Sequence, residues 1–210
     1  MTLIDLNQGL AFLAAAMLVT LSPGPDNLMV LSLGAARGRR QGMAFGLGCA
    51  LGCLSHTLLA ALGVSALIAA SPWAFSALTL AGGLYLVRLG WLALKYAGPM
   101  RLDNGEAPRT NAATLFRRGL VANAVNPKVI LFFLAFLPQF VAGNRGDAAS
   151  QIAQLGLLFT LQAALLFGTL GYAAGSIGQW LQRRPQAGLW LDRLAGMIFI
   201  GLGLRLIFSR

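Results

Sequence analysis

Two charged residues, Asp26 and Lys128, lie inside long apolar runs, and each follows a proline. A charge near the centre of a membrane helix costs about 2.5–3.5 kcal/mol on insertion scales, so we expect each of these charges to have a function. An ammonium and a carboxylate are also the groups that would hold the two charged ends of an amino acid. We therefore expect a substrate-binding or ion-coupling site built from short polar segments around both prolines. Its candidate residues are Ser22, Asp26, Asn27, Asn123, Asn126 and Lys128.

The prolines themselves predict two broken helices. Pro23, Gly24 and Pro25 interrupt the first apolar run, and Pro127 interrupts the fourth. Proline lacks an N–H and displaces the carbonyl four residues earlier, which frees backbone acceptors at Val19, Leu21 and Asn123. Such groups are tolerated in a membrane where they face protein or a water-filled cavity. Ser22-Pro23 and Asn126-Pro127 also have the form of a helix N-cap and first turn, whose positive dipole end suits an anion.

Other interpretations of the same residues remain open. Asp26 and Lys128 could form a static ion pair that only shapes the bundle. Cys49, Cys53 and His56 lie on one face of the second run, so a metal-ion or other small-solute exporter is the alternative function, although a packed or hydrogen-bonded histidine is favoured. No paired carboxylates or catalytic motif support an enzyme, and no cofactor or bound metal is expected.

The elements that must position these residues are membrane helices. The chain has 210 residues, of which 57% are hydrophobic and 10% charged, whereas soluble domains have roughly 25% charged residues. The fold class is therefore an all-α membrane protein in a lipid bilayer, forming one transmembrane domain over 1–210. Each run long enough to cross needs about 20 residues. Six such runs lie near 9–33, 42–69, 73–96, 117–141, 152–176 and 190–208.

The six runs fall into two groups of three, about 1–97 and 116–210, joined by a polar linker near 97–116. An odd number of helices in each half predicts an inverted repeat, with its broken helices 1 and 4 as counterparts. Self-association into a homo-oligomer is compatible with this composition. Four small residues in the second run, spaced for close helix packing, are Gly42, Gly46, Gly48 and Gly52.

The cations lie mostly in alternate gaps between these runs, which predicts the orientation. Arg and Lys residues on a membrane protein favour the cytoplasmic side. The same placement accounts for the net charge of +10 without nucleic-acid binding, which would need a basic stripe or patch. Both termini are then expected outside, in a bacterial inner membrane. The cations of the three rich gaps and their flanks are Arg37, Arg39, Arg40, Lys95, Arg101, Arg109, Arg117, Arg118, Arg183, Arg184 and Arg193.

Three segments resemble the LysE/RhtB family of amino-acid exporters. They are the stretch from Ser22 to Gly42, the segment FRRGLVANAVNPKVILFFLAFLPQFV from Phe116 to Val141, and DRLAGMIFIGLGLR from Asp192 to Arg205. The resemblance implies a six-helix inner-membrane exporter of amino acids or close derivatives, driven by the proton-motive force, with protons as the second partner. The motif positions that it carries over are Pro23, Gly24, Pro25, Asp26, Asn126, Pro127 and Lys128.

Overall fold

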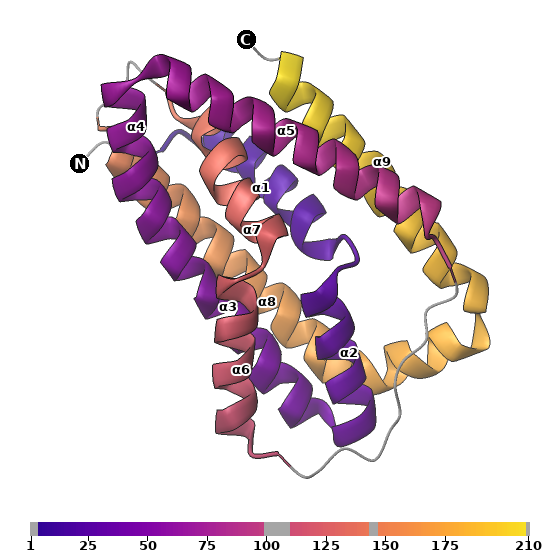
Figure 1. Cartoon of the computed structure of the whole chain (residues 1–210). Coiled ribbons are helices and arrows are strands. Elements are labelled where there is room, and N and C mark those ends of the chain that lie inside the picture. Colours follow the sequence, from indigo (N-terminus) through magenta and orange to yellow (C-terminus); the bar gives the residue numbers. More distant parts are fainter. Residues whose placement is uncertain (1–3, 99–109, 143–146, 209–210) are drawn as a thin grey trace.

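A computed structural model describes residues 4–98, 110–142 and 147–208, and every regular element in these ranges is helical (Figure 1). The all-helical fold class is therefore confirmed for the described part of the chain. The elements are α1 (Leu6–Leu21), α2 (Pro25–Arg37), α3 (Arg39–Leu59), the π-helical turn η1 (Ala60–Val64), α4 (Ser65–Ala70), α5 (Pro72–Lys95), α6 (Ala112–Ala124), α7 (Pro127–Leu131), the π-helical turn η2 (Phe132–Phe136), the 3₁₀ turn η3 (Leu137–Phe140), α8 (Ala148–Arg183) and α9 (Pro185–Phe208).

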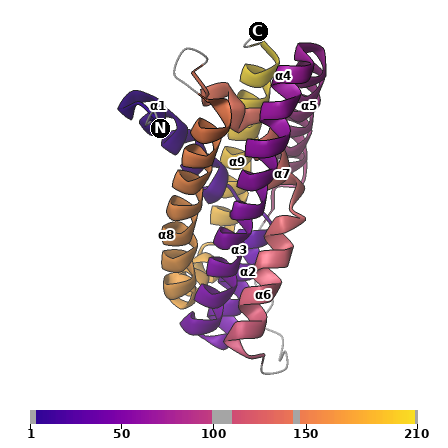
Figure 2. The same cartoon turned by 90° about the vertical axis from the view of Figure 1, so that its left-hand side faces the viewer.

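The long helices form the frame of the molecule. Helix α3 lies between α8 and α6 and packs along both (Figure 2). Helices α5 and α9 form a second close pair (Figure 1). The short helix α2 packs against α3 and α8, so the first helix break lies beside the α3–α8 pair.

The core is rich in aromatic side chains beside the second helix break. Phe132, Phe133 and Phe136 from η2 are buried and pack with Phe12 of α1 and Phe159 of α8. The rings of Phe133 and Phe159 meet edge to face with centroids 4.9 Å apart, a favoured geometry for aromatic pairs. This cluster holds the irregular segment η2 against two regular helices.

Glycines allow the closest helix contacts, as the spacing in the second run predicts. A Cβ on Gly48 of α3 would collide with the Phe116 carbonyl of α6, and one on Gly119 of α6 would collide with the Phe45 carbonyl of α3. The same backbone contact joins α5 and α9, where a Cβ on Gly90 would lie 2.5 Å from the Gly196 carbonyl oxygen. Close backbone approach through small residues is a common way for membrane helices to pack.

Three described helical segments are long and apolar enough to cross a membrane, and up to five if each bent pair counts as one span. The three are Arg39–Leu67, Trp73–Lys95 and Ala148–Leu181; the bent pairs are α1 with α2 and α6 with α7 to η3. The sixth predicted run is helical as part of α9, but it carries Asp192, Arg193 and Arg205. Its crossing, and the six-helix repeat with it, stays a prediction.

Helices α6, α8 and α9 extend beyond the predicted runs, and α9 begins at Pro185 rather than near 190. Helix α6 begins at Ala112 rather than near 117, because the Asn111 side chain caps it by accepting from the Ala113 N–H at 3.1 Å. Helix α8 extends at both ends beyond 152–176, because the Asp147 side chain caps its start and polar residues continue its last turns. Residues 99–109 of the predicted linker lie outside the described residues.

Candidate functional site

The first helix break separates α1 from α2 with a bend of 59°. Helix α1 ends at Leu21 and α2 begins at Pro25, with Gly24 as its N-cap. Side chains satisfy the carbonyls that this end of α1 leaves open. The Ser22 hydroxyl donates to the Val19 carbonyl at 2.6 Å, and Asn27 Nδ2 donates across the break to the Thr20 carbonyl at 2.8 Å.

The second break bends the chain by 50° between α6 and the segment from α7 to η3. Asn126 caps α7 by accepting from the Lys128 N–H at 3.1 Å, as the Asn-Pro pair predicts. The Asn123 carbonyl, freed by Pro127, accepts from the Asn126 N–H at 2.9 Å. His56 Nε2 lies 3.0 Å from the same oxygen and donates to it as the Nε2–H tautomer. The freed Asn123 carbonyl therefore has protein donors from both its own segment and α3.

Each break supplies the hydrogen-bond partner of the charge at the other break. Lys128 Nζ donates to the Ser22 carbonyl and hydroxyl oxygens, both at 3.1 Å, and lies 5.4 Å from the centre of the Phe199 ring. Asn123 Nδ2 donates to Asp26 Oδ2 at 2.9 Å. Asp26 is 5% exposed and Lys128 8% exposed. Two segments about a hundred residues apart thus form one buried polar cluster.

This arrangement differs from the direct ion pair that was the static alternative. Asp26 accepts from Asn123, and Lys128 donates to Ser22, with no ion pair between the two charges among the residues that the structure describes. A buried charge is costly unless hydrogen bonds and counter-charges compensate it. Here the hydrogen-bond partners of each charge are neutral groups.

Both charges line one small cavity between the breaks. Its volume is about 10 Å³, and Asn27 and Asn123 also line it, whereas Ser22 and Asn126 do not. Such a volume holds about one water molecule. The site is therefore closed, and an amino acid would enter only after the walls move.

Comparison with known proteins places the chain among transport proteins. A family model described as LysE type translocator matches residues 17–210. The chain belongs to the LysE family. A family of translocators makes this chain a multi-pass membrane transporter and not an enzyme.

Named relatives of this LysE family member cover nearly its whole length. The threonine efflux protein of Escherichia coli K12 is 32% identical over 95% of this chain and 98% of its own. The leucine efflux protein of Enterobacter sp. strain 638 is 28% identical, over 93% and 92%. An uncharacterized membrane protein of Vibrio cholerae is 31% identical, over 98% and 99%. No solved structure matches the chain.

In this LysE chain, the cysteine–histidine stripe supports the second break. Cys53 Sγ lies 3.5 Å from Asn123 Oδ1, His56 reaches the Asn123 carbonyl, and Cys49 is buried among apolar side chains. In the described part of the chain, no group of three or more His, Cys, Asp or Glu residues is arranged to hold a metal ion. Cys53 and His56 thus contact Asn123, which is the hydrogen-bond donor to Asp26.

The predicted site omits several residues of the cavity wall and its surroundings, among them Val129 and Phe159. Thr20 and Phe167 line the cavity. Gln162 of α8 donates from Nε2 to Thr20 Oγ1 at 2.8 Å, and its buried Oε1 has no partner in the described structure. Gln162 could have been found from sequence, because it is a polar residue near the middle of the predicted run 152–176. Phe167 gives no such signal in an apolar run.

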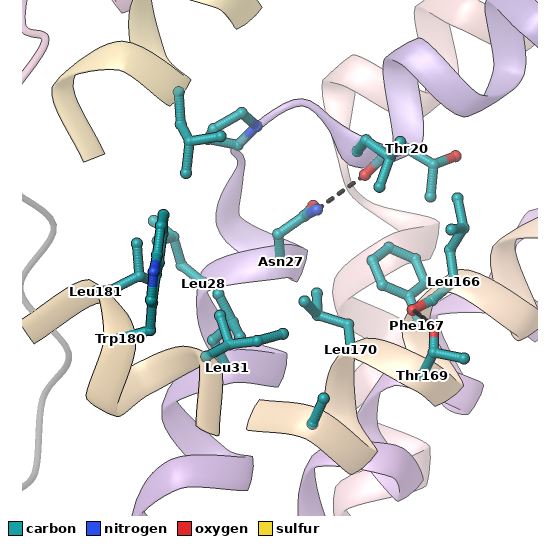
Figure 3. A pocket seen from close by; sticks show the side chains of 15 residues that line it. Thr20, Asn27, Leu28, Leu31, Leu166, Phe167, Thr169, Leu170, Trp180 and Leu181 are labelled. Carbon is teal, nitrogen blue, oxygen red and sulfur yellow. Dashed lines mark hydrogen bonds between the residues drawn. The ribbon is translucent and has the colours of Figure 1, made fainter. Parts of the chain in front are cut away.

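A larger pocket lies next to the cavity, between the first break, α8 and α9. Its volume is about 350 Å³. Figure 3 shows Trp180, Leu181 and Leu28 at the left of it and Leu166 and Phe167 at the right, with Asn27 between them and hydrogen bonded to Thr20. The pocket and the cavity share three wall residues, Thr20, Asn27 and Phe167.

Proposed function

We propose that this protein is a secondary transporter of the inner membrane that exports amino acids or their close derivatives, driven by the proton-motive force. The observation that carries the proposal is the pair of opposite buried charges, Asp26 and Lys128, on the walls of one cavity between two broken helices. Two relatives are named threonine and leucine efflux proteins, which supports an amino acid as the substrate.

In the proposed binding mode, the substrate replaces the present partners of the two charges. Its carboxylate accepts from the Lys128 ammonium, which now donates to Ser22. Its ammonium donates to the Asp26 carboxylate, which now accepts from Asn123. Each present hydrogen bond has one charged partner, whereas with the substrate both partners would be charged and would also attract each other. Asn126 already caps α7, so Lys128 rather than the α7 backbone is the anion ligand.

The proposed transport cycle alternates access around this cavity. We propose six crossings in two inverted halves, with the cation-rich gaps in the cytoplasm and both termini outside. Two helix contacts support the repeat. Helix α3 of the first half packs on α6 of the second, and α8 of the second half packs on α2 of the first, so each half packs against the broken helix of the other. Protons entering from outside compete with the substrate ammonium for Asp26 and return the transporter to its starting state.

The test is counterflow of radiolabelled leucine and threonine in liposomes that contain the purified protein, with and without a pH gradient. Asp26→Asn keeps the size and hydrogen bonding of the side chain but removes its titration. We expect it to retain some counterflow and to lose the response to the gradient. Zn²⁺ movement in the same vesicles is the control for the metal-ion alternative, and it should be absent.

The double variant Asp26→Asn, Lys128→Met separates a working site from an architectural one. An architectural pair should tolerate the loss of both charges, because no orphaned charge remains. A working site should not, and counterflow should fall to the level of empty vesicles. Full activity of the double variant would refute the proposed site, and absence of any amino-acid counterflow by the native protein would refute the proposed function.

A further inference from the structure

The closed cavity must join a neighbouring space when a substrate binds. Its volume of about 10 Å³ holds one water molecule and no amino acid. The 350 Å³ pocket shares the wall residues Thr20, Asn27 and Phe167 with it. We call these three residues the partition; they include the hydrogen bond from Asn27 Nδ2 to the Thr20 carbonyl at 2.8 Å and the buried ring of Phe167. Opening this partition makes a single space with a charged end and an apolar end.

The walls of the larger pocket are chemically uniform. Leucines, isoleucine, alanine, proline and tryptophan make up most of them, and no charged side chain lines the pocket. Among its polar residues, Thr169 donates to carbonyls of its own helix, Leu165 and Leu166. Asn27 is bonded to Thr20. Burial of a charged or strongly polar side chain there would cost several kcal/mol without compensation.

The size of the pocket and the position of its polar end argue for a small amphiphile. A volume of 350 Å³ lies in the range of roughly 300–1,000 Å³ that small-molecule sites occupy. A lipid chain would also fit the apolar walls, but it carries no group that could pair with the two buried charges behind the partition. Gln162 Oε1, buried and without a partner in the described structure, adds an acceptor at the Thr20 side of that polar end.

We infer that the pocket between α2, α8 and α9 receives the side chain of the exported amino acid, while Asp26 and Lys128 hold its charged ends. The substrates are then neutral amino acids with large aliphatic or aromatic side chains. Phe167 and the Asn27–Thr20 hydrogen bond form the partition that yields when such a side chain binds. This inference rests on the proposed function and names the substrate class of the same site.

The first test fills the pocket. Ala173 of α8 lines it, whereas Ser176 of the same helix is exposed and does not. Ala173→Phe should lower leucine counterflow by on the order of tenfold. Counterflow of alanine should stay nearly unchanged, because the methyl side chain of this substrate does not reach the pocket. Ser176→Phe, the matched control, should change neither. Gel filtration of the purified variants shows whether each is folded.

The second test enlarges the pocket. Its expected result is a change in substrate preference rather than a loss of transport. Leu28 lines the pocket and is 38% exposed, so its truncation should leave the fold intact. Leu28→Ala should raise the rate of tryptophan relative to leucine, which a destabilised protein would not do. The assignment is supported if the rate of tryptophan relative to leucine rises in Leu28→Ala and falls in Ala173→Phe.

The outcomes distinguish a wrong pocket assignment from a wrong proposed function. Unchanged ratios among leucine, alanine and tryptophan in both variants overturn the pocket assignment and favour a lipid chain as its occupant. Native vesicles that move threonine or lysine but not leucine also overturn it, while leaving amino-acid export intact. Native vesicles that move no amino acid overturn the proposed function and this inference together.

Discussion

The two helix breaks use the same chemistry but lie in different surroundings. At the first break, Pro23, Gly24 and Pro25 turn the chain beside the 350 Å³ pocket, and the N-cap glycine contributes no side-chain hydrogen bond. At the second, the Asn126 side chain caps α7, and α3 contributes His56 and Cys53 to Asn123. The first break borders a pocket, whereas at the second Asn123 and Asn126 are buried against α3 although Val125 is exposed.

The difference indicates which break moves. The first break borders the 350 Å³ pocket, and the hydrogen bonds there include Ser22 to Val19, Asn27 to Thr20 and the two that Lys128 donates to Ser22. The second continues into the phenylalanine cluster of η2, whose rings are almost fully buried. Regions with few buried apolar contacts open at lower free energy than core elements. We therefore expect α2 to swing about Ser22–Gly24 while α6 and α7 stay fixed.

The largest expected effect comes from the charge at the fixed break. Lys128→Met keeps the length of the side chain but removes the cation that faces Ser22. Hydrogen bonds to charged groups contribute about 1.5–3 kcal/mol, so counterflow should fall by roughly 10- to 150-fold. Lys95→Met is the control, since Lys95 is an exposed lysine at the end of α5. Equal losses in both variants would contradict a specific role for Lys128.

An intermediate effect should separate the two breaks by one matched substitution. Asn123→Ala removes the donor to Asp26 and the acceptor for Cys53, and should lower the free energy of unfolding by about 1–3 kcal/mol. Asn27→Ala removes one hydrogen bond, the one to the Thr20 carbonyl, and should cost less, about 1 kcal/mol. Thermal unfolding in detergent measures both. A larger loss for Asn27→Ala would reverse the assignment of fixed and moving breaks.

The smallest effect is expected in the stripe on α3. His56→Gln keeps a donor for the Asn123 carbonyl, and Cys49→Ala shortens a buried side chain by one atom. Each should lower the free energy of unfolding by about 1 kcal/mol or less and leave counterflow nearly unchanged. Loss of transport at normal membrane abundance would instead support a proton-relay or metal role for His56.

Sequence patterns predicted the breaks well because proline acts locally. Pro23, Pro25 and Pro127 remove N–H groups wherever they stand, so the ends of α1 and α6 follow from the chain alone. The freed carbonyls at Val19 and Asn123 were also predictable, but not their partners. His56 reaches Asn123 from a helix 67 residues away, and only tertiary packing decides such a contact. The predicted roles of Asp26 and Lys128 in binding stay predictions.

The packing and the pocket were less accessible to sequence reasoning. The glycines of α3 indicated close packing, but not that Gly48 meets α6 and Gly46 meets Phe167 of α8. The pocket beside the first break arises from the shapes of α2, α8 and α9 together. Phe167 belongs to both cavities only because of this arrangement, and nothing in its apolar neighbourhood distinguishes it from other core residues.

The small size of the cavity between the breaks also has a consequence for the cell. A membrane that stores energy as an ion gradient is short-circuited by any continuous file of water molecules through one of its proteins. The space around Asp26 and Lys128 holds about one water molecule, and the buried rings of Phe159 and Phe167 border it. A cavity of this size has no room for a continuous file of water molecules between Asp26 and Lys128. If the protein works as proposed, this space opens only when a substrate binds.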